Sequence, residues 1–323
     1  MLFFIFEELM ILNNLFPAEK ILDVLKVQIF PSTECVEVND AFVKALFRFG
    51  VSSFQQALQG QPFAVKQTSK SSKHDPVFSH FTLQNAEGFE NDSPLNEFDR
   101  AVLGILISEF LAGNHFSTVN IIFRALIGKV GDQNVRPMKN QKSAIFNSIF
   151  KLMGTVVDFK NLSDVLKGLH YSDKDGNFIS LRSSNLISID ILDAKVNGQI
   201  LNDVIFFKDN SPLFLIADSK NQIVRYPHYL LDVPNLNNTP RIISIKKYVL
   251  RRICEIKLHK MTTTITFDDV FSKCRLLDCP RNVKMDARNS IINLFHHLQE
   301  KNFIASFELV LQRQKFVAVK FSF

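Results

Sequence analysis

The chain has 323 residues, of which 46% are hydrophobic and 22% are charged, with only 11 glycines and 11 prolines. This composition excludes disorder and fibrous repeats for most of the chain, and the length suits two domains of ordinary size. The longest apolar stretch, within residues 1–12, is interrupted by Glu7 and Glu8, so it predicts neither a membrane span nor a signal peptide. We therefore expect a globular, cytoplasmic protein that does not enter a membrane.

Positive charge is concentrated near the C-terminus. The whole chain carries a formal charge of +6, from 38 Lys and Arg against 32 Asp and Glu. Residues 241–323 contain 16 of the basic and 7 of the acidic residues, which is a local charge of +9, whereas residues 1–240 sum to −3. Such a segment favours a polyanionic partner, and nucleic acid is the leading candidate. A basic lobe with no such partner is the alternative.

The residue patterns of common catalytic and metal sites are missing from the sequence. Its four cysteines form neither a zinc-site pattern nor a disulfide framework, and there is no G-x-x-x-x-G-K-[ST] phosphate loop. The acidic run at residues 173–177 lacks the glycine and glutamate that a calcium loop requires. The adjacent His296 and His297 are not the His-hydrophobic-His pair of a rolling-circle nickase. We therefore expect no enzymatic activity, no metal and no cofactor.

The first 95 residues divide by composition into two parts. Apolar residues recur at helical spacing over 21–29 and 41–49, so residues 1–65 are predicted to form a mainly helical region. Residues 66–95 are rich in Ser, Lys, Asn and Pro, which predicts a polar linker and a domain boundary near residue 95.

Residues 96–210 are predicted to contain three helices followed by a β-hairpin. The second helix is expected between Thr118, a favourable N-cap, and Gly128, and the third begins near Pro137. Alternating residues then predict a strand at 155–159 and a hairpin over 166–188 around the Asp175–Gly176 turn. A second hairpin around Asn197–Gly198 is taken as an extension of this wing, and residues 211–240, with a short helix at 212–219, as a connector.

The same order of elements recurs in residues 241–323. The expected elements are a helix at 244–259, a strand at 262–266, a helix opened by Thr266, a helix at 283–300 and two strands, 306–311 and 316–323, joined by a turn at 312–315. Three helices followed by a hairpin is the winged-helix order. We therefore predict an α+β protein in which two tandem winged-helix domains follow a mainly helical N-terminal region.

Candidate DNA-contacting residues follow from this prediction. The third helix of such a domain enters the major groove, where Asn suits adenine and Arg suits guanine, while basic residues of the wing neutralise phosphates. The candidates in the second domain are Arg281, Lys284, Arg288, Asn289 and Asn293 on the helix, and Arg313 and Lys315 at the wing tip. Those in the first domain are Arg136, Lys139 and Lys142. Because residues 96–160 carry a net charge of only +3, we also expect the first domain to self-associate as a homodimer.

Several short motifs resemble one known family. They are Phe98-Asp99-Arg100-Ala101-Val102-Leu103, Ala112-Gly113-Asn114, Phe123-Arg124-Ala125-Leu126, Ser148-Ile149-Phe150-Lys151-Leu152, Pro212-Leu213 and Tyr248-Val249-Leu250-Arg251-Arg252-Ile253 with Lys257. In their order and spacing these motifs resemble plasmid replication initiator (Rep) proteins of low-GC Gram-positive bacteria, over about residues 96–323.

This resemblance implies that the protein is an initiator. Such a protein would bind repeats of double-stranded DNA at a plasmid or mobile-element origin, help to open the adjacent AT-rich duplex and recruit host replication proteins, without catalysis. A winged-helix transcriptional regulator is the main alternative, because its DNA contacts would be the same. A nickase that uses Tyr226 or Tyr229 is the third.

Overall fold

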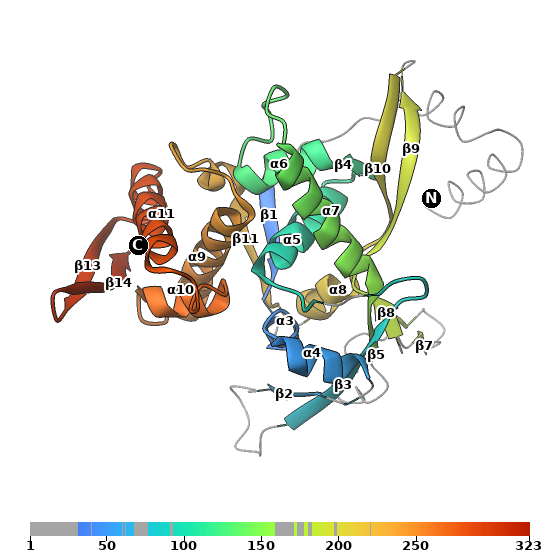
Figure 1. Cartoon of the computed structure of the whole chain (residues 1–323), viewed down its shortest axis with the longest axis horizontal. Helices are drawn as coiled ribbons and strands as arrows, with labels where there is room; N and C mark the ends of the chain where they lie inside the picture. The colour runs from blue at the N-terminus through green and yellow to red at the C-terminus, as the bar shows by residue number, and fades with distance from the viewer. Residues whose placement is uncertain are drawn as a thin grey trace, which may run out of the picture.

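The computed structural model describes residues 32–39, 41–59, 61, 63–67, 77–90, 93–158, 171–172, 178–179, 183–196, 199–219 and 221–323. Over these residues the chain is a mixed α+β protein with several small sheets (Figure 1). No described helix combines the length and the apolar character needed to cross a bilayer. The helix expected at 21–29 and the apolar residues near the N-terminus lie outside the described residues.

Helix α5 (Glu97–Leu111) is the centre of the first half of the chain. The Asn96 side chain accepts hydrogen bonds from the backbone N–H groups of Phe98 and Asp99, and the Asp99 carboxylate accepts one from Asn96 N–H at 2.9 Å. This reciprocal capping box fixes the start of the helix. Helices and strands surround α5, so that every residue from its first to Glu109 is buried. The surrounding elements are β1 (Glu34–Val38), α6 (Val119–Ile127), α7 (Lys139–Gly154) and α9 (Pro240–His259).

Strand β1 lies directly on α5 and pairs antiparallel with β11 (Ile223–Pro227). The backbone N–H of Val36 donates to Ser108 Oγ at 2.8 Å, and a Cβ atom on Gly104 would lie 3.1 Å from Val36 O. The strand can approach the helix this closely because residue 104 is a glycine. The prediction of a mainly helical region over residues 1–65 is therefore wrong for β1, although α3 (Ala41–Leu46) and α4 (Val51–Leu58) follow it.

The same succession of elements occurs twice along the chain. The first unit runs α5, β4, α6, α7, β9, β10, with the sheet order β4-β10-β9, and four short strands described within residues 155–185 are inserted between α7 and β9. The second runs α9, β12, α10, α11, β13, β14 without such an insertion, with the order β12-β14-β13. In both units the first strand therefore lies beside the last. The bounds not yet given are β4 Phe116–Thr118, β9 Ser188–Val196, β10 Gln199–Asp209, β12 Thr264–Thr266, α10 Phe267–Lys273, α11 Arg281–Glu300, β13 Ser306–Gln312 and β14 Lys315–Ser322.

The predicted ends of α6 and the predicted start of α10 agree with the structure, whereas α9 begins at Pro240 and α11 at Arg281, a few residues before the expected 244 and 283. The Thr118 side chain accepts a hydrogen bond from Ile121 N–H, and Gly128 ends α6 in the left-handed conformation at φ 84°. In the second unit Thr266 caps α10 through Asp269 N–H at 3.1 Å. The carboxylate of Asp269 does not complete a capping box, because it accepts a hydrogen bond from Tyr248 of α9.

The hairpin that joins the first sheet differs from the one expected. Strand β10 pairs with β9 and with β4. Within the 166–188 segment, β6 (Tyr171–Ser172) and β7 (Phe178–Ile179) pair with each other as a separate hairpin, outside this sheet. Both predicted turn dipeptides lie outside the described residues. The Asp-Gly signal is local, while β9 and β10 contribute Ile189, Ile205 and Phe207 to the core, and this burial decides which hairpin completes the sheet.

The polar segment before residue 95 contains a strand. Strand β3 (Val77–Asn85) pairs with β2 (Phe63–Gln67) and with β5 (Thr155–Asp158), which also pairs with β8 (Ser183–Asn185). The linker expected at 66–95 is therefore wrong for these residues, since Leu83 lies opposite Val157 and both are fully buried. The connector contains the predicted helix α8 (Pro212–Ser219), then β11 and the short 3-10 helix η2 (His228–Leu231).

Candidate nucleic-acid interface

Helix α11 separates an apolar side from a polar one. Ala287, Ile291, Leu294 and Leu298 are buried as predicted, and the helix packs on α9 and β13. Since successive residues of a helix are about 100° apart, the positions farthest around the helix from this stripe lie on the other side, whereas Ser290, Phe295 and His297 are buried with the stripe. The exposed residues there include Asn289 and Asn293, with Arg281 exposed and Lys284 half-buried at the N-terminal end.

Arg288 does not belong to this polar side. Its guanidinium lies 5.7 Å from the ring centre of Phe267 and 5.6 Å from that of Phe271, both on α10. Its Nε is buried without a partner among the described residues. Arg288 therefore holds α10 against α11 by cation–π contact, and it is less available to a ligand than Asn289.

The tip of the second hairpin presents two basic side chains. Strands β13 and β14 extend to Gln312 and Lys315, so the predicted four-residue turn is a two-residue turn made by Arg313 and Gln314. Both have positive φ, 47° and 61°, as in the type I′ turns that match the twist of a hairpin. Arg313 and Lys315 are both exposed, so both could contact a phosphate backbone.

The corresponding helix of the first unit has a mixed surface. Lys139 and Lys142 of α7 are exposed, as is Arg136 in the preceding loop, and the Lys142 ammonium lies 5.5 Å from the Phe146 ring centre. On the same helix the Phe150 side chain is 46% exposed. Apolar groups thus lie among the predicted basic contacts of α7, as the exposed Met285 does on α11.

Comparisons with known proteins identify no relative of this chain. No protein-family model, curated protein or solved structure matches the chain. The resemblance to plasmid initiators therefore depends on the sequence motifs. Most residues of the two longest motifs are buried in α5 and α9, so these motifs hold the fold and the candidate contacts lie elsewhere.

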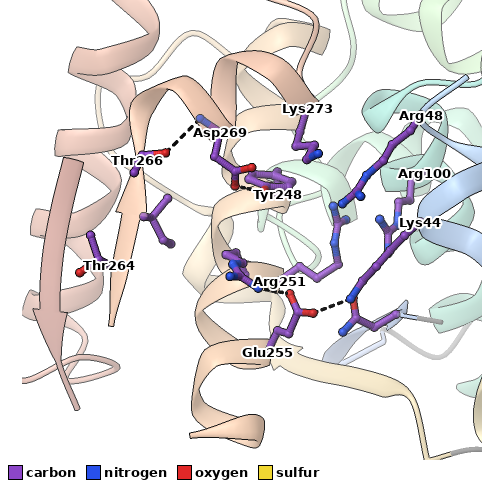
Figure 2. A pocket seen from close by; sticks show the side chains of 13 residues that line it. Lys44, Arg48, Arg100, Tyr248, Arg251, Glu255, Thr264, Thr266, Asp269 and Lys273 are labelled. Carbon is purple, nitrogen blue, oxygen red and sulfur yellow. Dashed lines mark hydrogen bonds and ion pairs between the residues drawn. The ribbon is translucent and has the colours of Figure 1, made fainter. Parts of the chain in front are cut away.

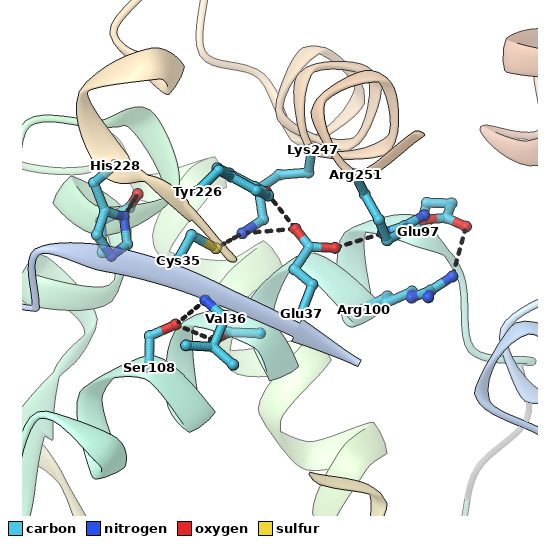
Figure 3. A network of polar contacts seen from close by, with 12 residues as sticks. Cys35, Val36, Glu37, Glu97, Arg100, Ser108, Tyr226, His228, Lys247 and Arg251 are labelled. Atoms are coloured by element: carbon cyan, nitrogen blue, oxygen red, sulfur yellow. Dashed lines mark hydrogen bonds and ion pairs between the residues drawn. The ribbon is translucent and has the colours of Figure 1, made fainter. Parts of the chain in front are cut away.

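Sequence reasoning missed a network of buried charges that joins β1, α5, α9 and β11. Glu37 of β1 accepts hydrogen bonds from Lys247 at 3.0 Å, from Arg251 Nη1 at 2.6 Å and from the Tyr226 hydroxyl. The Nη2 atom of Arg251 donates to Glu97 of α5 at 2.6 Å (Figure 3). The network therefore ties the N-terminal strand, the first unit and the second unit together at one point.

The environment of this network sets its protonation states. Burial raises the pKa of Glu37, but the charges of Lys247 and Arg251 outweigh that effect and lower it to about 2. Burial raises the pKa of the Cys35 thiol, which contacts the Lys247 ammonium. Glu37 is thus a carboxylate at every physiological pH, and Cys35 is a thiol.

These buried groups correct the charge expected for residues 241–323. Lys246, Lys247 and Arg251 are at most 3% exposed, and Lys246 donates to Leu231 O at 2.7 Å and to Asn238 Oδ1 at 2.8 Å. Burial lowers the pKa of Lys246 to about 7. Without these three residues the local charge of +9 falls to +6. The positions of these three residues around their helix could have predicted their burial, but a count of charges ignores position.

The groups singled out for catalysis are dispersed. His296 packs edge-on against Phe307, and the His297 ring nitrogen lies 3.4 Å from Tyr229 O. Tyr226 is buried in the charge network, whereas the Tyr229 side chain is 51% exposed. Among the described residues, no three His, Cys, Asp or Glu side chains lie close enough to hold a metal ion.

Proposed function

We propose that the chain is a tandem winged-helix protein that binds double-stranded DNA. The observation that carries this proposal is the repeated order of helix, strand, two helices and hairpin, interrupted in the first unit by β5 to β8, with the first strand beside the last in both sheets. That order and pairing are the ones a winged helix has. A basic second unit with an exposed polar helix face adds the chemistry that DNA requires.

In this proposal α11 enters the major groove and the hairpin tip lies on the backbone. Asn289 and Asn293 would contact base edges, while Arg281 and Lys284 flank them near phosphates. Arg313 at the tip would neutralise a phosphate. The helix α7 of the first unit, with its three basic residues, would make a second and weaker contact.

Binding to a replication origin is the role that the sequence motifs favour. The protein would then bind repeats at the origin of a plasmid or mobile element and bring in host replication proteins. The deciding assay supplies the gene in trans to a plasmid that carries its flanking DNA. Autonomous replication supports the initiator, whereas repression of a promoter without replication supports a transcriptional regulator.

The binding mode is tested with single substitutions in the full chain. Asn289→Ala should cost about 1–3 kcal/mol on specific DNA with little change on random DNA, whereas Arg313→Ala should weaken both alike. The control is Lys301→Ala, which removes an exposed cation at the end of α11 away from the proposed contacts. Equal losses on both DNAs for Asn289→Ala would show that another face reads the sequence.

A further inference from the structure

A cavity of about 490 Å³ lies between the N-terminal segment with α5 on one side and α9, β12 and α10 on the other (Figure 2). Lys44, Arg48 and Arg100 enter its wall from the first side. Arg252 and Lys273 belong to the second. A cavity of this size is within the range of small-molecule sites.

The wall of the cavity is strongly cationic. Of its described lining residues, six are Lys or Arg and two, Glu255 and Asp269, are acidic. Glu255 is shared between Lys44 and Arg252, the latter at 2.8 Å, and Asp269 accepts a hydrogen bond from the Tyr248 hydroxyl. The formal charge of the lining residues is therefore +4, and the two carboxylates already have donors.

Arg100 has the least complete set of partners. Its Nη2 donates to Val38 O at 2.6 Å, its Nη1 lies 3.7 Å from Glu97, and its Nε is buried without a partner among the described residues. Glu97 already accepts from Arg251 at 2.6 Å. The buried cluster thus contains three cations, Lys247, Arg251 and Arg100, against two carboxylates, Glu37 and Glu97. One positive charge at the cavity wall lacks a counter-charge, which is costly in a buried position.

We propose that this cavity binds a small diffusible anion that carries phosphate groups, such as pyrophosphate or the phosphates of a nucleotide. Guanidinium groups match phosphate oxygens in pairs, and lysines add point charges, which is the composition of this wall. A multivalent phosphate supplies the missing counter-charge. The proposal goes beyond DNA binding and does not depend on it.

Such an anion would join the two sides of the cavity. Arg48 and Lys273 lie on opposite sides of the space in Figure 2, and neither forms an ion pair with another described residue. Both are at least partly exposed, so they can be substituted without opening the core. They are therefore the residues that separate a ligand role from a structural one.

The test is calorimetric titration of the full-length protein with pyrophosphate, with chloride used to hold the ionic strength constant. We expect saturable binding that weakens at least about tenfold in the double variant Arg48→Gln/Lys273→Gln, since each lost contact is a charge-assisted hydrogen bond. Lys301→Gln, which removes a cation outside the cavity, should bind as the natural chain does. The charge-retaining pair Arg48→Lys/Lys273→Arg should recover most of the affinity.

Further arms identify the source of the phosphate. ATP and pyrophosphate in parallel show whether a nucleotide is preferred, and either preference supports the proposal. Absence of saturable binding, or equal binding by the Gln double variant, would overturn it. Competitive displacement of pyrophosphate by duplex DNA, with parallel loss of DNA affinity in the double variant, would assign the cavity to a DNA phosphate and also overturn it.

Discussion

Glu109, near the end of α5, should make the protein less stable as the pH rises through neutrality. Its Oε2 accepts a hydrogen bond from Asn114 at 2.8 Å, and its Oε1 is buried without a partner among the described residues. Burial raises the pKa of this carboxyl from 4.5 to about 7, although Asn114 and the charge of Arg124 oppose the rise. The folded chain therefore holds a proton that the unfolded chain has released between these two pH values.

The size of the effect follows from the two pKa values. Stability falls with pH wherever the folded state binds more protons, and a rise from 4.5 to about 7 corresponds to about 3 kcal/mol in the free energy of unfolding. Glu109→Gln, an uncharged mimic of the protonated side chain, removes this dependence. Relative to the natural chain, the variant should gain about 3 kcal/mol between pH 4.5 and pH 8.

Urea unfolding at a series of pH values measures this difference. Glu87→Gln is the matched control, because it removes a carboxylate from an exposed position. If the free energies of unfolding of Glu109→Gln and the natural chain change in parallel from pH 4.5 to 8, the pKa of Glu109 is not raised in the folded protein.

Two further substitutions test the packing around the charge network and α6. Glu37→Gln should lower the free energy of unfolding by about 3–5 kcal/mol at pH 7, because it leaves the buried cations Lys247 and Arg251 without their carboxylate. The difference from the natural chain should shrink as the pH falls from 4.5 toward 2, since Glu37 itself is then protonated. Denaturant titration at a series of pH values measures this difference. Gly128→Ala would place a Cβ atom 2.5–2.9 Å from backbone atoms of the segment at η2, and it should lower the free energy of unfolding by about 3 kcal/mol or more, measured by thermal unfolding. The control is Gly113→Ala, which has a similar φ but open space around it and should cost about 1–2 kcal/mol. Equal costs for the two variants would show that the backbone at η2 moves easily away from the new Cβ atom.

Local signals were enough to predict much of the second unit. The stripe of Ala287, Ile291 and Leu294 lies within one helix, so its burial and the exposure of Asn289 follow from helical periodicity. The cap at Thr266 is equally local. In both cases the residues that determine the structure are close together in the sequence.

The failures concern partners that are distant in the sequence. Strand β1 finds its hydrogen bonds on β11, almost two hundred residues away, and nothing within 34–38 indicates that pairing. Arg251 is similar, because its carboxylate partners are 214 and 154 residues distant and a count of charges treats it as surface. The cation–π contacts of Arg288 are equally hidden from local reasoning, because the rings of Phe267 and Phe271 belong to another helix.

The position of Glu37 bears on how the protein can be divided. A cut before residue 241 would separate Lys247 and Arg251 from the carboxylates that neutralise them, and leave Arg100, 3.7 Å from Glu97, as the one cation of the buried cluster against Glu37 and Glu97. Residues 241–323 are thus a unit of structural repetition without being a unit of folding. If residues 241–323 were exchanged between related chains, the protein would fold only if the strand at 34–38 were exchanged as well. We therefore expect these two segments to be inherited together.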